Sequence, residues 1–281
     1  MININRLTET LSVPTVYGFE DKMRDYIVNQ LNDRNIQNYT DEHGNVYATK
    51  GSANKFPCVV AHIDTVHEIT EFSVVENNYK LSAIKPDGSP TGIGGDNKAG
   101  VFVCLELLDR FDNLKAAFFV SEEVGCLGSY LSDPIFFENV GYAIQFDAPF
   151  NNWVSHYSDG VELFSPESDF FEIVNQIFEE SLPNYYGVLG NHPYTDVSAL
   201  KVLYNFSCLN YSVGYYNMHS INEYVSIMDV DLCLNTAVKL VSALGEHLYE
   251  FPKSNKRLIT ESFKEDIKHK LNFYKRKKGL N

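Results

Sequence analysis

The stretch Phe56-Pro-Cys-Val-Val-Ala-His-Ile-Asp64 is an apolar run that ends in a histidine and an acid. A second such run, Ala116-Ala-Phe-Phe-Val-Ser-Glu-Glu123, ends in two acids, and a third, at 142–146, leads into Asp147. These runs have the composition of β-strands. Stretches with helical patterns alternate with them, at 98–111, 169–180 and 229–248. This alternation predicts an α/β protein. We expect a three-layer α/β/α sandwich around a central mixed, mostly parallel sheet.

Shorter elements precede this alternation. Met23, Ile27 and Leu31 form one stripe at a spacing of four, which predicts an opening helix at 20–31. His43-Gly-Asn45 has the composition of a hairpin turn, and Asn77-Asn78 separates two further β-rich runs.

The chain has 281 residues, close to the upper size of a single hydrophobic core. No linker or internal repeat divides it before the basic segment after Pro252, so we expect one catalytic domain at 1–252 and a basic amphipathic helix or tail at 253–281. Apolar residues recur at every fourth position of that tail, at Ile259, Phe263, Ile267 and Leu271. Docking of this stripe on the body is one hypothesis, and contact with a partner, a second copy or an anionic surface is the other.

Charge divides the chain in the same place. Residues 253–281 contain ten Lys or Arg and three acidic residues, so they carry +7 of a net charge of −14, and residues 1–252 carry −21. An acidic body disfavours nucleic-acid binding, which needs positive potential. No apolar run is long enough to span a membrane, the amino terminus does not resemble a signal peptide, and the five cysteines include no CxxC pair. We therefore expect a cytoplasmic protein with reduced thiols and no integral membrane association.

The ends of the predicted strands carry side chains that can bind metal. Open α/β sheets bind ligands at the carboxyl ends of their strands, so these side chains can converge on one crevice. They are His62, Asp64, Glu122, Glu123, Asp147 and His219, joined by Asp96 after a glycine-rich turn. Five carboxylates in one cleft are costly unless cations are present. Two divalent ions would offset most of this charge, and the mixture of imidazole and carboxylate suits Zn²⁺, or Mn²⁺ or Co²⁺.

These residues lie in five segments, which follow one another along the chain in this order: Ala61-His-Ile-Asp-Thr-Val66, Gly94-Gly-Asp-Asn-Lys-Ala-Gly100, Ser121-Glu-Glu-Val-Gly125, Asp147, and His219-Ser-Ile-Asn-Glu-Tyr-Val225. This set resembles the signature of the co-catalytic zinc exopeptidases. Peptidase T and the aminoacylase-type metallopeptidases are the nearest, and the glutamyl aminopeptidases are more distant. The resemblance covers roughly residues 5–245.

The resemblance implies a role for each of these side chains. Asp96 would bridge two metal ions, His62 and Asp147 would complete one site, and Glu123 and His219 the other. Glu122 would be the general base that takes a proton from water and passes it to the leaving amine. Asp64 would orient the His62 ring, in agreement with its spacing, because residues two apart in a strand share a face.

Two features bear on the substrate, which we expect to be a peptide or a small amide. Many peptidase T-like relatives insert a lid between the equivalents of Asp147 and His219, whereas 71 residues lie between them here, too few for a lid. No arginine lies between 111 and 256, so a guanidinium clamp for a substrate carboxylate is poorly supplied. An acidic cleft favours a cationic α-amine, which makes an aminopeptidase our leading hypothesis. Lys98 and Lys201 keep a dipeptidase or N-acyl amino-acid deacylase open.

Further hypotheses concern single residues and the chain as a whole. His192, Tyr194 or Tyr216 could stabilise an oxyanion, or could be packing residues. Ser220 and Glu223 have the spacing of a helix capping box, which favours a structural role for both. A catalytically inactive binding module is a further alternative, and an oligomer is compatible with the sequence.

Overall fold

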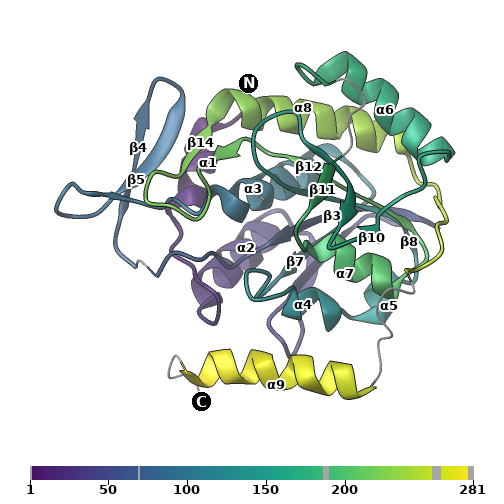
Figure 1. Ribbon diagram of the computed structural model, residues 1–281, viewed down its shortest axis with the longest axis horizontal. Coiled ribbons are helices and arrows are strands. Elements are labelled where there is room, and N and C mark those ends of the chain that lie inside the picture. Colours follow the sequence, from purple (N-terminus) through teal and green to yellow (C-terminus); the bar gives the residue numbers. More distant parts are fainter. Residues whose placement is uncertain (1, 69, 186–189, 255–260, 278–281) are drawn as a thin grey trace.

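The computed structural model describes residues 2–68, 70–185, 190–254 and 261–277, and it shows a central sheet between two layers of helices (Figure 1). Nine strands form this sheet: β1 (Gln37–Thr40), β2 (Val46–Lys50), β3 (Phe56–His62), β7 (Leu114–Phe119), β8 (Val140–Ala148), β9 (Val154–Ser158), β10 (Val161–Glu162), β11 (Gly190–His192) and β12 (Ser207–Ser212). Their spatial order is β1-β2-β7-β3-β8-β12-β9-β10, and β11 pairs with β9. The predicted α/β/α architecture is confirmed.

The four central strands, β7, β3, β8 and β12, are parallel to one another, and antiparallel pairs extend the sheet on both sides. Every residue of β3, β7 and β8 is buried, which explains their continuous apolar runs. His62 at the end of β3 pairs with Phe119 at the end of β7. The residues that follow these strands therefore emerge side by side at one edge of the sheet.

Helices cover both faces of the sheet. They are α1 (Ile4–Ser12), α2 (Asp21–Asp33), α3 (Gly95–Arg110), α4 (Leu127–Tyr130), α5 (Pro134–Phe137), α6 (Asp169–Ser181), α7 (Asp196–Leu203), α8 (Ile227–Leu244) and α9 (Glu261–Lys277). In Figure 1, α3, α6 and α8 lie above the sheet, and α4, α5 and α7 lie below it. The helices predicted at 98–111, 169–180 and 229–248 correspond to α3, α6 and α8.

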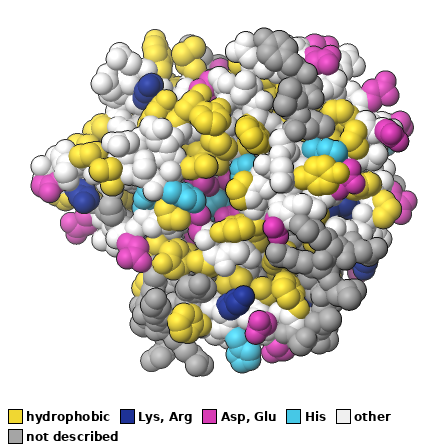
Figure 2. Space-filling model, viewed as in Figure 1, with side chains coloured by type: hydrophobic (Ala, Val, Ile, Leu, Met, Phe, Trp, Pro, Cys, Tyr) yellow, Lys and Arg dark blue, Asp and Glu magenta, His cyan; other side chains and the backbone are white. Residues whose placement is uncertain are grey.

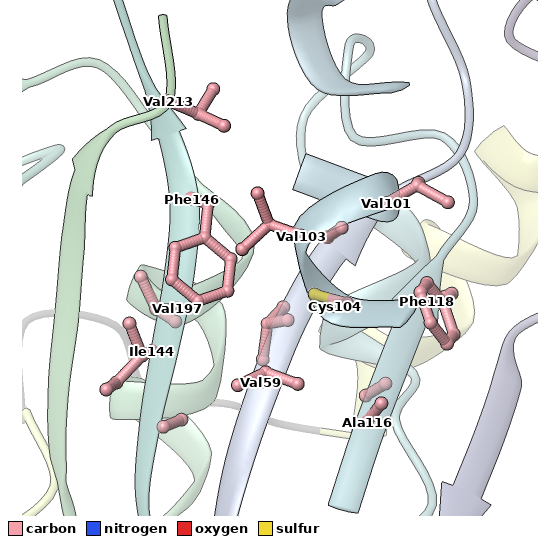
Figure 3. Packing of buried hydrophobic residues seen from close by; sticks show 14 of the residues in the cluster. Val59, Val101, Val103, Cys104, Ala116, Phe118, Ile144, Phe146, Val197 and Val213 are labelled. Carbon is pink, nitrogen blue, oxygen red and sulfur yellow. The ribbon is translucent and has the colours of Figure 1, made fainter. Parts of the chain in front are cut away.

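Helix α3 forms the centre of one apolar layer. All its residues from Gly95 to Leu108 are buried, and it packs against β3, β7 and β8. Figure 3 shows Val103 and Cys104 of this helix close to Val59 of β3 and Phe146 of β8. A helix buried on all sides is held firmly in place, and so is the residue at its amino end, Asp96.

A second, small sheet stands beside the amino end of α3. It contains β4 (Ser73–Asn77), β5 (Lys80–Ile84), β6 (Pro90–Thr91), β13 (Tyr215–Tyr216) and β14 (Tyr224–Ser226). Strands β4 and β5 form the hairpin predicted around Asn77-Asn78, which projects from the body in Figure 1. Because β13 and β14 pair with each other and β14 pairs with β5, this sheet joins the segment around His219 to the segment that precedes α3.

Helix α9 packs against the body through its apolar stripe. Ile267 and Leu271 are buried, and the ring of Phe263 meets that of Tyr130 in α4 edge to face, with 5.4 Å between centroids. Ile259, the fourth member of the predicted stripe, lies outside the described residues. Across the ranges described, no helix is both long and apolar enough to cross a membrane.

Replacing Leu271 with aspartate should release α9 from the body. Leu271 is 2% exposed, and an unpaired charge left buried there would cost about 3–5 kcal/mol. We expect limited digestion with trypsin to cut the tail of this variant several-fold faster than that of the wild type. The matched control is Asn272→Asp, which adds the same charge at an exposed neighbouring position. Equal cleavage of the two variants would contradict the docking.

Candidate functional site

The structure brings together all seven residues predicted at the strand ends. His62 ends β3, Glu122 and Glu123 follow β7, and Asp147 lies near the end of β8. Asp64 follows His62 by two positions, Asp96 lies at the start of α3, and His219 lies between β13 and β14. Figure 2 shows histidine and acidic side chains gathered near the middle of the visible face, with hydrophobic side chains around them.

His62 is surrounded by carboxylates. Its Nε2 lies 3.1 Å from Asp96 Oδ1, 3.6 Å from Asp147 Oδ1 and 3.9 Å from Glu122 Oε2. On the other side of the ring, Nδ1 donates to the backbone oxygen of Asp64 at 3.1 Å. Since a carbonyl oxygen only accepts, this hydrogen bond places a proton on Nδ1. In the neutral ring the lone pair of Nε2 then faces the carboxylates.

Asp96 lies between the two histidines. Its Oδ1 contacts His62 as described, and its Oδ2 lies 3.4 Å from His219 Nε2. The same His219 atom is 3.1 Å from Glu123 Oε2. The side chain of His219 is 48% exposed, whereas that of His62 is buried. One carboxylate therefore spans two imidazoles, one at the bottom of the site and one at its rim.

Asp64 positions the segment that follows β7. Its Oδ1 accepts the backbone N–H of Glu122 and its Oδ2 that of Glu123, both at 3.0 Å. The same Oδ1 lies 3.4 Å from His62 Nδ1. Sequence spacing predicted only the contact with the histidine ring. The two backbone hydrogen bonds add a second task, because they fix where the adjacent glutamates leave the chain.

The pKa shifts show how strongly this cluster attracts positive charge. Burial raises the pKa of Glu122, Glu123 and Asp147. Hydrogen bonds to Asp96 and Glu123 raise the pKa of His219 to about 10. Burial would lower the pKa of His62, but the carboxylates of Glu122 and Asp147 outweigh it and raise that pKa. The site therefore favours cations over neutral groups.

The donor atoms have the arrangement of a metal site. His62, Asp96 and Glu123 each offer one ligand atom, and these atoms lie within 4.8 Å of one another. Glu123 Oε1 is buried, and it has no hydrogen-bond partner among the described residues. A buried carboxylate oxygen is costly to leave unpaired. Two imidazoles among carboxylates suit Zn²⁺, so the residues present fit a divalent metal.

Three amide side chains, which the sequence did not single out, hold Asp147. Asn97 Nδ2 donates to its Oδ1 and Gln145 Nε2 to its Oδ2, both at 3.2 Å, and Asn210 Oδ1 accepts its backbone N–H at 2.9 Å. Gln145 also donates to Asp196, whose pKa burial raises to about 7. Only two sequence signals point to these amide side chains. Gln145 shares a strand face with Asp147, and Asn97 directly follows Asp96.

The structure separates the three candidates for oxyanion stabilisation. Tyr216 donates its hydroxyl to Asp229 at 2.8 Å, so this group is engaged elsewhere. Tyr194 donates to the backbone oxygen of Glu123 at 3.3 Å, beside the cluster. Burial lowers the pKa of His192, although the charge of Asp96 acts in the opposite direction. Its Nδ1 is buried without a hydrogen-bond partner in the described part of the chain.

The capping box expected at Ser220 and Glu223 is wrong. Residues 220–222 form turns rather than a helix, and α8 begins at Ile227 with Ser226 as its N-cap, which accepts from Asp229 N at 3.3 Å. Glu223 instead is buried and accepts the backbone N–H groups of Gly94 and Asp96. These distant donors replace the local ones that a capping box requires.

No protein-family model and no curated protein matches the sequence, whereas solved structures match the fold. A tripeptidase from Staphylococcus aureus has a TM-score of 0.71 at 12% identity, covering 86% of this chain and 98% of that chain. Aminopeptidase PepT from Bacillus cereus has a TM-score of 0.69 at 12% identity, with 86% and 97% covered. The Pyrococcus horikoshii TET1 peptidase, which can assemble into a tetrahedron or a large octahedral shell, has a TM-score of 0.60 at 16% identity, with 84% and 98% covered. The chain therefore has the fold that these three peptidases share, as its motifs predict.

Proposed function

We propose that this chain is a metal-dependent hydrolase that removes the amino-terminal residue from peptides. One observation carries the proposal. Two imidazoles and four carboxylates from separate segments of the chain converge on one site at the carboxyl edge of the sheet, and the carboxylate of Glu122 lies among them. Its Oε2 is 3.9 Å from His62 Nε2, and its side chain is buried.

In this proposal Asp96 would be a ligand of both members of a pair of divalent ions, Zn²⁺ or alternatively Mn²⁺ or Co²⁺. His62 and Asp147 would complete the ligands of one ion, and Glu123 and His219 those of the other. When bound, the metal pair polarises the scissile carbonyl and lowers the pKa of water. The amides of Gln145 and Asn97 keep Asp147 in place, and Asp64 keeps the backbone of Glu122 and Glu123 in place.

Glu122 is the proposed general base. Its neighbour Glu123 reaches His219, whereas Glu122 faces the His62 side of the site, so adjacent acids serve different tasks. Burial raises the pKa of Glu122. A carboxylate with a raised pKa is a stronger base toward water and, once protonated, a donor to the leaving nitrogen.

The positions of the basic side chains support an amine-binding rather than a carboxylate-binding site. Lys98 Nζ is buried and donates to the backbone oxygens of Leu11 and Val13, at 2.6 and 3.2 Å. Lys201 Nζ donates to the backbone oxygen of Phe251 at 2.5 Å. Burial lowers the pKa of Lys98 to about 7 and that of Lys201 to about 8. Neither lysine is placed to bind a substrate carboxylate.

The four arginines whose side chains the structure describes are paired with acidic residues outside the cluster. Arg6, Arg34 and Arg110 pair with Glu106 or Asp109 at the far end of α3, and Arg24 pairs with Asp21 of its own helix. A dipeptidase or N-acyl amino-acid deacylase needs a cation for the carboxylate of its substrate. An aminopeptidase instead binds an ammonium group, which the acidic site supplies with partners.

A substrate panel with a metal-removal arm tests the proposal. With Zn²⁺, Mn²⁺ or Co²⁺ present, we expect hydrolysis of aminoacyl amides, which have a free amine and no carboxylate, and no hydrolysis of N-acetyl amino acids. Chelation should abolish turnover, and added metal should restore it. Faster cleavage of N-acetyl amino acids would favour the deacylase. A pure protein that neither binds metal nor cleaves any member would favour the binding module.

A further inference from the structure

Glu223 is a buried carboxylate outside the proposed ligand set. Its side chain is fully buried, and its two oxygens accept three hydrogen bonds. Oε1 accepts the backbone N–H of Asp96 at 3.1 Å, and Oε2 accepts that of Gly94 at 2.8 Å. The third contact joins Oε2 to Nε2 of His67, also at 2.8 Å. We propose that Glu223 is a positioning residue that, together with His67, fixes Asp96 between His62 and His219.

The proposal rests on the proposed function, because it concerns how the bridging carboxylate is held. Asp96 has both oxygens directed at histidines, so a small shift of its backbone would lengthen one contact as it shortens the other. Glu223 fastens that backbone at Asp96 itself and two residues before it. Metal ligands are commonly oriented by hydrogen bonds of this kind, and losing one typically costs 10–100-fold in metal affinity.

The glycine-rich turn leaves little freedom for another arrangement. Gly94 has a φ of 69°, and a Cβ added there would lie 2.7 Å from Thr65 Cγ2. A Cβ on Gly92 would lie 2.0 Å from the ring of His67, so the imidazole lies directly against the backbone of the turn. The turn is therefore enclosed by the His67 ring while Glu223 binds its N–H groups.

His67 is itself held from the other side. Its backbone N–H donates to Thr65 Oγ1 at 3.3 Å, and Thr65 Oγ1 donates to the backbone oxygen of Thr15 at 2.7 Å. The contacts thus run from the loop after β3, through His67 and Glu223, to the amino end of α3. This route joins the segment that carries His62 to the one that carries Asp96 without using either side chain.

A glutamine at position 223 separates a positioning role from a merely structural one. Glutamine has nearly the same shape, but its amide nitrogen cannot accept the N–H of Gly94 or Asp96. For Glu223→Gln we expect the dissociation constants for Zn²⁺, measured by competition with a chromophoric chelator, to rise about 10–100-fold. The visible spectrum of the Co²⁺-loaded variant should change as well, because it reports the geometry of the ligands. Thermal unfolding of the metal-free protein shows whether the variant is folded.

The chain offers a matched control in Glu162, which forms a similar pair with His156, at 3.0 Å, away from the cluster. Glu162→Gln should leave the metal constants unchanged. His67→Phe removes one donor and keeps a ring, and it should weaken metal binding in the same direction, by up to about 10-fold. His67→Gln, which keeps a donor, should restore part of that loss. If Glu223→Gln fails to fold, the metal dissociation constants of the two His67 variants test the positioning role instead.

The outcomes separate the two levels of the proposal. A wild-type chain that binds no divalent metal would contradict the proposed function itself. A wild-type chain that binds two ions, with folded Glu223 and His67 variants that bind them equally tightly, would overturn only the positioning role. Weaker binding in these variants, with Glu162→Gln unchanged, would establish it.

Discussion

Replacing Glu122 with glutamine should lower kcat by about 10²–10⁴-fold, the usual contribution of a general base, while the chain keeps its metal ions. The expected loss is large because glutamine cannot take a proton from water or return one to the leaving nitrogen. Metal should be retained because Glu122 is not in the proposed ligand set. Its closest approach to a histidine nitrogen of the cluster is 3.9 Å, whereas Glu123 lies 3.1 Å from one.

The neighbouring residue provides the contrast that makes this measurement decisive. Glu123→Gln makes the same chemical change one position later, and we expect it to weaken metal binding. Metal content by atomic spectroscopy and kcat on an aminoacyl amide should be measured on the same samples. A Glu122→Gln variant that holds two ions and turns over at a near-normal rate would show that another group is the base.

Replacing Asp96 with alanine should weaken the binding of both ions together. Asp96 is the one carboxylate whose two oxygens face different histidines, His62 and His219. Removal of a direct ligand should exceed the 10–100-fold loss caused by removing a supporting hydrogen bond, so we expect both dissociation constants to rise by more than about 100-fold. Turnover should be lost at any metal concentration near that of the protein.

Titration of the protein with Zn²⁺, monitored by calorimetry, measures both dissociation constants directly. Asp25→Ala is a suitable control, since it removes the same charge from an exposed position on α2. Loss of one ion with normal binding of the other would refute the bridging role of Asp96. Equal affinities in Asp96→Ala and the wild type would refute the ligand assignment as a whole.

The strand ends could be predicted because burial leaves a clear trace in the sequence. Strands β3, β7 and β8 are buried throughout and mostly apolar, so the polar residues at their carboxyl ends mark the edge of the sheet. The common direction of these strands then brings the polar residues together. The main helices were predictable for a similar reason, since α6 and α8 are long enough to show a helical pattern.

What was missed depends on partners that are distant in the chain. Asn210 reaches Asp147 across 63 positions, and an asparagine has no spacing that reveals such a contact. The strands β13 and β14 have two and three residues, too few to show a pattern. Ser220 and Glu223 match a local capping rule, yet the N–H groups that Glu223 binds lie 127 and 129 positions away.

The order of the segments along the chain has a consequence for protein synthesis. The parallel core is complete only when β12, residues 207–212, has been inserted beside β8, and His219 follows it. A nascent chain that has not yet reached residue 207 contains His62, Asp96 and Glu123 but neither the second imidazole nor the Glu223 contact. Under the proposed ligand set, the full group of donors would assemble only after β12 has been inserted and His219 has been added.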